Sequence, residues 1–157
     1  MTIASMSKAA ALEIISWTYE PPYSMYNLEN VPEQIEELLN GNYYVYHCPD
    51  GTVYGFFCYG HDAQVPGGQK DGVYKSDALD IGLGMNPIFT GQGYGQSFFQ
   101  VGLHYGRETF EPNRFRLSVN RSNQRAINLY RKCNFVTVDR FNNPGPPKAE
   151  FLLMEEM

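Results

Sequence analysis

The segment NPIFTGQGYGQSFF, residues 86–99, places three glycines within five positions, at Gly91, Gly93 and Gly95. It follows the apolar run ALDIGLGM and precedes QSFFQVGL, so it stands between an expected strand and an expected helix. Glycines at such a junction make either a turn without a ligand or a backbone cradle for a phosphate at the helix N-terminus. The glycines alone leave both interpretations open.

Composition limits what kind of protein carries this segment. A chain of 157 residues is long enough to bury a core of its own, and we expect a single domain over residues 1–157. The net charge of -5 and the pI near 5.1 argue against a nucleic-acid-binding surface and favour partners that carry amines. The charge does not identify such a partner.

The cysteines and the N-terminal segment indicate a reducing compartment. Cys48, Cys58 and Cys133 are odd in number and lack metal-ligand spacing, so we expect buried thiols and neither a disulfide framework nor a metal site. Residues 1–17 contain no long apolar run, because Glu13 interrupts the one candidate. We therefore expect a cytoplasmic protein that does not bind a membrane.

Hydrophobic periodicity predicts helices alternating with strands in the first half of the chain. Asp50-Gly51, between two apolar runs, is typical of a hairpin turn, and the glycine-rich segment His61–Ser76 is expected to be a mobile loop. The expected elements are a strand at residues 2–4, helices at residues 7–17 and from about Pro32 to Gly41, and strands at residues 43–48 and 52–60.

The second half begins with the strand that leads into the glycine segment. The helix after it carries Gly102 and Gly106 four residues apart, where missing side chains permit close packing on a sheet, and Ser122 is expected to cap the next helix. The expected elements are strands at residues 78–85, 114–119, 135–141 and 149–156, and helices at residues 96–110 and 122–135. Together these predict an α/β (α+β) fold with a mixed, mainly antiparallel central sheet flanked by about four helices.

Two familiar phosphate-binding motifs do not fit. A Rossmann fingerprint needs G-x-G-x-x-G and an acidic residue on the next strand, but here the glycines alternate and that strand carries Arg114 and Arg116. A Walker loop needs Lys-Ser or Lys-Thr after the glycines, and neither pair follows them here. A dinucleotide-binding module therefore stays only as a third hypothesis.

A second motif lies about thirty residues further on. In VNRSNQRAINLYRKCNF, residues 119–135, the side chains of Asn123, Ala126 and Tyr130 share one helical face. With a rise of about 1.5 Å per residue, Asn123 and Tyr130 stand about 10 Å apart along the helix. An amide and a phenol on this face could line one extended ligand.

Together the two motifs resemble those of the GNAT superfamily of N-acetyltransferases. The chain is similar to bacterial-type members whose substrate is unassigned. MNPIFTGQGYG is similar to the family's Gln/Arg-x-x-Gly-x-Gly/Ala cofactor motif, and VNRSNQRAINLYRKCNF to its V-x-x-x-N-x-x-A-x-x-x-Y-x-x-x-G-F motif. The resemblance covers residues 77–138. Thr90 departs from the usual Gln or Arg, and Asn134 from the usual glycine, where Asn also suits a left-handed helix end.

The resemblance implies a site for acetyl-CoA (CoA) as co-substrate, with no metal. Asn123 either contacts the pantetheine arm or caps its own helix. Backbone amides at the helix start are implied to hold the pyrophosphate, and the end of the preceding strand to pair with pantetheine. The implied cofactor-binding residues are Leu83, Gly84, Met85, Gly91, Gln92, Gly93, Tyr94, Gly95, Gln96 and Asn123.

The resemblance also implies catalytic roles. Tyr130 is expected to donate a proton to the departing thiolate, and a strand amide near Met85 to stabilise the oxyanion. An alkyl amine is protonated at pH 7, so a base is needed, and Asp80 is the candidate, although it could equally be a solvated strand residue. Nothing local activates Cys133 as an acyl-carrying nucleophile, so we expect it to be buried.

The acceptor side is expected in the aromatic segment SWTYEPPYSMYN. Trp17, Tyr19, Tyr23 and Tyr26 either form a wall that holds an amine by cation–π contact or pack onto the helices. The leading hypothesis is an acetyl-CoA-dependent N-acetyltransferase acting on a small-molecule or peptide amine, as a monomer or homodimer. The alternative is a module of this fold that binds CoA or acyl-CoA without efficient catalysis.

Overall fold

The computed structural model describes residues 2–157. The described residues form two compact units, one made of residues 2–58 and 83–95 and the other of residues 59–82 and 96–157. The expectation of a single domain stays a prediction.

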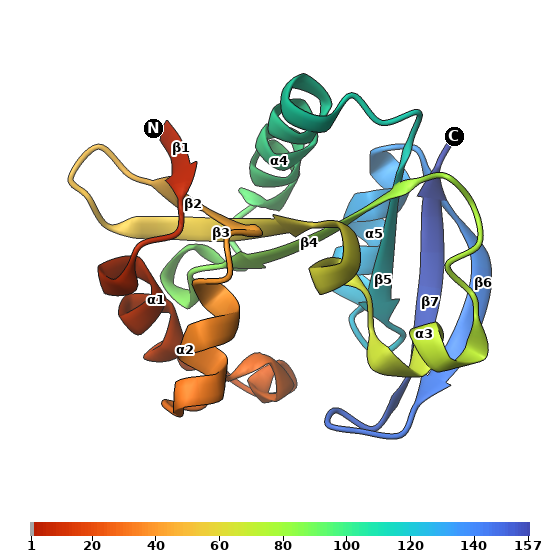
Figure 1. The fold of residues 1–157 in the computed structure, drawn as a ribbon, viewed down its shortest axis with the longest axis horizontal. Helices are drawn as coiled ribbons and strands as arrows, with labels where there is room; N and C mark the ends of the chain where they lie inside the picture. The colour runs from red at the N-terminus through yellow and green to blue at the C-terminus, as the bar shows by residue number, and fades with distance from the viewer. Residues whose placement is uncertain (1) are drawn as a thin grey trace. The chain divides into compact units, whose positions relative to one another are not determined.

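The first unit is built on a hairpin and two short helices. Its antiparallel strands are β1 (Thr2–Ser5), β2 (Tyr43–His47) and β3 (Val53–Tyr59), and its helices are α1 (Lys8–Ile15) and α2 (Pro32–Leu38). Figure 1 shows α1 and α2 side by side next to β2 and β3. The buried side chains of α1 and the strands include Ala11, Ile14, Val45 and Phe57.

Local chemistry explains where these elements begin and turn. The Ser7 hydroxyl oxygen accepts a hydrogen bond of 3.1 Å from the Ala10 amide and caps α1, and Pro32 occupies the first turn of α2. Gly51 has a φ of +91° in the turn between β2 and β3. These predicted helices and the predicted hairpin are confirmed.

The second unit holds the other strands. Strand β4 (Leu79–Met85) starts in this unit and ends in the first, and it pairs in parallel with β5 (Phe115–Asn120) through Leu79–Phe115 and Asp80–Arg116. Strand β7 (Ala149–Glu156) pairs antiparallel with both β5 and β6 (Phe135–Asn143). Among residues 2–157 the strand order is β1-β2-β3-β4-β5-β7-β6, which confirms the mixed, mainly antiparallel sheet.

Helices α3 (Pro66–Asp71), α4 (Gly95–Phe110) and α5 (Gln124–Lys132) belong mainly to the second unit. The prediction that glycines bring α4 close to the sheet is confirmed at Gly106, where an added Cβ would lie 2.8 Å from the rings of Phe115 and Tyr59. The Tyr59 hydroxyl donates a hydrogen bond of 2.6 Å to the Gly102 carbonyl. The described chain thus has five α-helices where about four were expected.

The segment His61–Ser76, which its glycines predicted to be a mobile loop, contains regular structure. It includes most of a 3₁₀ turn at Gly60–Ala63 and helix α3, which Figure 1 shows beside β6. An added Cβ on Gly67 would lie 2.7 Å from the backbone of Asn143, and the Gly67 amide donates a hydrogen bond to the Asn143 side-chain oxygen. Gly67 is therefore a packing residue, which composition alone does not distinguish from a flexible one.

Candidate functional site

The glycine segment begins with a turn that Asn86 organises. Asn86 is only 5% exposed; its side-chain amide donates to the Val53 carbonyl at 2.9 Å, and its side-chain oxygen accepts from the Ile88 amide at 3.2 Å. A 3₁₀ turn follows over Pro87–Phe89, and the Phe89 ring stacks on Tyr54 with centroids 4.6 Å apart. The turn is thus anchored to β3 before the glycines begin.

Gly91 and Gly93 adopt left-handed backbone conformations, with φ of +73° and +86°. A Cβ added to Gly93 would meet nothing within 4 Å, so packing does not explain this glycine and backbone conformation does. Residues 91–94 are exposed and lead directly into the 16-residue helix α4. Since the first amides of a helix lack intrahelical partners, this exposed turn presents N–H groups suited to an anion.

Two polar side chains of the turn are occupied by the turn itself. The Thr90 hydroxyl donates to the Pro87 carbonyl at 2.8 Å, and the Gln92 side-chain amide donates to the Ile88 carbonyl at 2.7 Å. Thr90 therefore stabilises the 3₁₀ turn at the position where the resembled family carries Gln or Arg. Anion binding at this turn would depend on backbone amides.

The end of β4 is held by aromatic residues from two other segments of the first unit. A Cβ on Gly84 would lie 2.4 Å from the Phe56 ring, and Trp17 stacks on that ring with centroids 6.1 Å apart. The next residue, Met85, accepts a hydrogen bond of 2.7 Å at its carbonyl from the Tyr19 hydroxyl. A ring contact at Gly84 and a tyrosine hydrogen bond at Met85 thus constrain two consecutive residues that were predicted to bind pantetheine.

The aromatic segment 17–26 divides into supporting and accessible residues. Trp17 is 9% exposed against Phe56, and Tyr19 is half-buried with its hydroxyl on Met85. Tyr23 is half-buried and Tyr26 is 37% exposed, with the Tyr26 ring edge-on to Tyr19 at 6.2 Å. The packing alternative therefore describes Trp17 well, whereas Tyr26 retains surface that an acceptor could contact.

Helix α5 carries Asn123 and Tyr130 in the second unit. Asn123 is the N-cap, and its side-chain oxygen accepts a hydrogen bond of 3.2 Å from the Ala126 amide, so the capping alternative holds for that oxygen. The predicted cap Ser122 is wrong by one position, since the Ser122 hydroxyl donates to the Asn120 side chain. The Tyr130 ring is buried against Phe99, with centroids 4.9 Å apart.

Asp80, the expected base, lies in a buried ion pair. Its two carboxylate oxygens accept hydrogen bonds of 2.7 and 2.8 Å from the Arg116 guanidinium, and the Gln64 side chain donates a third of 2.7 Å. The side chains of Asp80 and Arg116 are 2% and 3% exposed. Asp80 is therefore not a solvated strand residue, and the three hydrogen bonds argue against its predicted role as a base.

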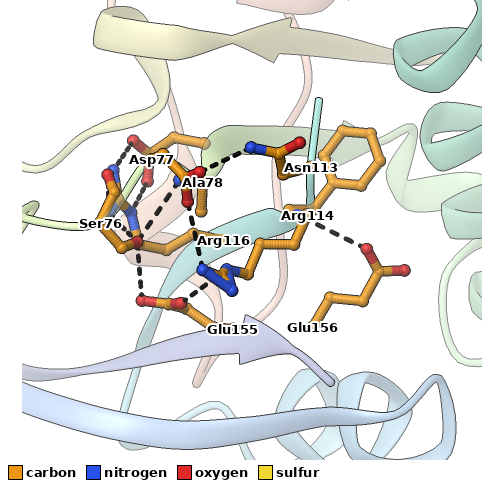
Figure 2. Close-up of polar contacts among 10 residues, drawn as sticks. Ser76, Asp77, Ala78, Asn113, Arg114, Arg116, Glu155 and Glu156 are labelled. Atoms are coloured by element: carbon orange, nitrogen blue, oxygen red, sulfur yellow. Dashed lines mark hydrogen bonds and ion pairs between the residues drawn. The ribbon is translucent and has the colours of Figure 1, made fainter. Parts of the chain in front are cut away.

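A wider polar network surrounds this ion pair. The Ser76 hydroxyl oxygen accepts from Arg116 at 3.0 Å, and the Ser76 hydroxyl donates to Glu155 at 3.1 Å, as Figure 2 shows. Arg114, also in Figure 2, pairs near the surface with Asp77 at 3.2 Å and with Glu155 at 3.5 Å. The hydrogen bonds to Asp80 raise the pKa of Arg116 above its ordinary value, against the opposing effect of burial.

Burial also governs the tyrosine and cysteine groups of interest. Burial first, and Tyr26 second, raise the pKa of Tyr19, and burial raises the pKa of the Cys133 thiol. The Gln100 side chain donates to the Cys133 sulfur at 3.6 Å. A thiol with a raised pKa is a poor nucleophile, so the expectation of a buried Cys133 without an acyl-carrying role agrees with its surroundings.

The structure distributes the predicted site residues over both units. Leu83, Gly84, Met85, the turn from Gly91 to Gly95 and the four aromatic residues lie in the first unit, and Asp80, Gln96, Asn123 and Tyr130 lie in the second. Their predicted roles stay predictions. No helix in residues 2–157 combines the length and apolar character needed to cross a membrane, and no three His, Cys, Asp or Glu side chains of that range gather as potential metal ligands.

Three structurally important residues were not predicted from the sequence. Asn86 organises the glycine turn, Asn27 accepts the Tyr19 backbone N–H at 2.7 Å, and Arg116 neutralises Asp80. The Asn86-Pro87 pair after a strand is a turn-initiating signal that could have identified the first. Arg116 stands between the apolar residues Phe115 and Leu117 of its strand, and no local signal marks it as buried.

Comparisons with known proteins agree with this arrangement. The described fold is similar to a spermidine N-acetyltransferase chimera of Vibrio cholerae SpeG and hSSAT, with a TM-score of 0.71 and 16% identity, over 99% of this chain and 95% of that one. It is also similar to a GNAT-family acetyltransferase from Bacillus anthracis, with a TM-score of 0.72 and 12% identity, over 99% of this chain and 93% of that one.

A third similar structure is the GNAT-family acetyltransferase from Streptococcus pneumoniae, with a TM-score of 0.63 and 16% identity, over 99% of this chain and 97% of that one. No curated protein matches the sequence. At these identities the structures establish the fold. Residues 9–135 match the acetyltransferase (GNAT) family itself, and this match covers most of the chain, so the protein belongs to that family.

Proposed function

We propose that the protein transfers the acetyl group of acetyl-CoA to a primary amine by direct attack. The observation that carries the proposal is the exposed turn with left-handed Gly91 and Gly93 at the N-terminus of α4, in a chain of the acetyltransferase (GNAT) family. Open space around Gly93 leaves room for a ligand to approach the backbone closely. The three free cysteines fit a cytoplasmic location.

The binding of acetyl-CoA would use backbone groups more than side chains. The amides of residues 91–96 would donate to the pyrophosphate, where the positive end of the α4 dipole favours negative charge. The Leu83–Met85 backbone would pair with pantetheine as a strand does. Strand β4 pairs with β5 at Leu79 and Asp80, which precede Leu83–Met85 on the strand.

Catalysis would follow from polarisation and proton transfer. The amine nitrogen forms a bond to the acetyl carbon, a strand amide near Met85 stabilises the oxyanion, and the carbon–sulfur bond then breaks. Tyr130 gives its proton to the departing thiolate and regains one from solvent. The proton of the attacking amine leaves to water, because the hydrogen bonds of Asp80 oppose a role as the base.

A second candidate function has a specific observation in its favour. The Asp80 carboxylate accepts hydrogen bonds from Arg116 and Gln64 that oppose its predicted role as a base, and a module that binds CoA or acyl-CoA without efficient turnover would not need one. The two candidates predict the same ligand and differ in turnover.

The decisive experiment measures acceptor-dependent thiol release from acetyl-CoA across a panel of small amines, polyamines and peptide amines. Spermidine belongs in the panel, since a structurally similar enzyme is named for it. Thiol release with at least one amine, together with an acetylated product of the expected mass, supports the acetyltransferase. Acetyl-CoA binding by calorimetry without release across the whole panel would favour the binding module.

A further inference from the structure

Tyr19 and Met85 are joined by a hydrogen bond although they are 66 residues apart in sequence. The Tyr19 hydroxyl donates to the Met85 carbonyl at 2.7 Å. The backbone of Tyr19 is itself held, because its N–H donates to the Asn27 side-chain oxygen at 2.7 Å. The hydroxyl therefore reaches the end of β4 from a fixed position in the aromatic segment.

The peptide group that follows Met85 is held at both ends. Its carbonyl accepts from Tyr19, and its N–H, which belongs to Asn86, donates to the Tyr54 carbonyl at 2.9 Å. Because a peptide group is planar, two hydrogen bonds at opposite ends determine the orientation of the plane. The Asn86 side chain adds a bond to the Val53 carbonyl at 2.9 Å.

The chemistry of Tyr19 suits this role and not acid–base work. A carbonyl oxygen can only accept, so the shared proton belongs to the tyrosine. Burial raises the pKa of Tyr19, with a smaller contribution from Tyr26, which keeps the hydroxyl protonated at neutral pH. The Tyr19 hydroxyl therefore keeps its proton for the hydrogen bond to the Met85 carbonyl.

We propose that Tyr19 is a positioning residue, which through its hydroxyl fixes the strand end that binds acetyl-CoA, and that it does not contact the acceptor amine with its ring. The inference rests on the proposed function, because the binding of acetyl-CoA by Leu83–Met85 is itself part of that proposal. Loss of the hydroxyl frees the carbonyl end of the Met85–Asn86 peptide while leaving the ring in place. A displacement of about 1 Å at a reacting group can cost about a hundredfold in rate.

The test compares Tyr19→Phe with Tyr43→Phe. The Tyr43 hydroxyl donates to Glu37 at 3.1 Å in the same unit, so this control also removes a tyrosine hydrogen bond, and it keeps the ring that lies against Phe56. For Tyr19→Phe we expect kcat/KM for acetyl-CoA to fall about 10- to 100-fold, with the KM of the amine unchanged. Tyr43→Phe should keep wild-type kinetics.

The alternatives give different results. Wild-type kinetics in Tyr19→Phe would overturn the proposal, because the hydroxyl would then be dispensable. A change confined to the KM of the amine would overturn it in favour of direct contact between the hydroxyl and the acceptor. Equal losses of activity in both variants, following equal losses of melting temperature, would overturn it in favour of a merely structural hydroxyl.

Acetyl-CoA affinity, measured by calorimetry, separates this proposal from the proposed function. If the wild type binds acetyl-CoA but releases no thiol, the proposed acetyl transfer is wrong. A weaker affinity for acetyl-CoA in Tyr19→Phe than in Tyr43→Phe then still supports the positioning role of Tyr19, and equal affinities in the two variants would overturn that role. A wild type that does not bind acetyl-CoA overturns both.

Discussion

Asp80 and Arg116 share two hydrogen bonds, of 2.7 and 2.8 Å, between side chains that are almost completely buried in the second unit. The residues are direct neighbours on the parallel strands β4 and β5. An ion pair with this geometry is costly to break from one side, because the remaining charge stays buried without its partner. Asp80 is therefore first a stability residue.

Asp80→Asn should lower the free energy of unfolding by about 3–5 kcal/mol, since it leaves Arg116 buried without a counter-charge. Urea denaturation measures the change. The control is Asp77→Asn, which removes the partially exposed partner of Arg114 and should cost less than about 1 kcal/mol. A variant as stable as the wild type that loses acetyl transfer, with a shifted pH–rate profile, would restore Asp80 as the base.

Tyr130→Phe should lower kcat by about 10²- to 10⁴-fold if Tyr130 is the general acid, because the thiolate must then leave without a proton. The phenyl ring keeps its packing on Phe99, so the melting temperature and acetyl-CoA affinity should change little. Steady-state kinetics and calorimetry measure these quantities. Tyr105→Phe on α4 is the matched control, and an equal loss of kcat in both variants would contradict the assignment.

Gly93→Ala should weaken acetyl-CoA binding. Its φ of +86° strains an L residue by about 1–2 kcal/mol, while open space around the new methyl group excludes a clash. Gly51→Ala is a close control, since Gly51 has a φ of +91° and equally open surroundings in the hairpin turn. Both variants should lose similar stability, and only Gly93→Ala should lose affinity in calorimetry. Unchanged affinity would mean that the turn does not bind the pyrophosphate.

Cys133 should make the protein less stable at alkaline pH. Burial raises the pKa of the folded thiol, so above the ordinary pKa of about 8.5 the unfolded chain loses the proton first. Ionisation then favours the unfolded state, and this part of the stability, complete at neutral pH, is lost as the pH rises. Urea denaturation of the wild type and Cys133→Ser at pH 7.5 and 10 measures it.

The difference in free energy of unfolding between the wild type and Cys133→Ser should narrow at the higher pH, and a constant difference would contradict the raised pKa of Cys133.

The same variant tests whether Cys133 carries the acetyl group covalently. Because nothing activates this thiol, Cys133→Ser should keep acetyl transfer. A complete loss of thiol release in a folded variant would indicate an acyl-cysteine intermediate instead.

Local patterns were sufficient for most of the fold. The hairpin around Gly51, the strand β5 with its alternating Phe115 and Leu117, and the helix α4 after the glycines all follow from periodicity and turn chemistry within short windows. The helix cap at Asn123 was missed by one residue, because Ser122 and Asn123 are both good caps and contacts to Asn120 decide between them.

The remaining features depend on distant contacts. Gly67 was interpreted as flexible because glycine composition is the same in a loop and against a neighbouring strand, and only the closeness of Asn143 distinguishes them. Asp80 was interpreted as a base because its partner Arg116 is 36 residues away. Tyr19 was predicted as part of an aromatic wall, and its hydroxyl bond to Met85 has no sequence signature at all.

The fit between Gly84 and Phe56 also constrains how this sequence can change. Since a Cβ at position 84 would lie 2.4 Å from the Phe56 ring, alanine is tolerated there only after position 56 has become smaller. A mutational path that changes position 84 first passes through a destabilised intermediate, whereas the opposite order leaves a cavity that the new methyl group partly fills. Homologous sequences with a side chain at position 84 should therefore carry a smaller residue at position 56.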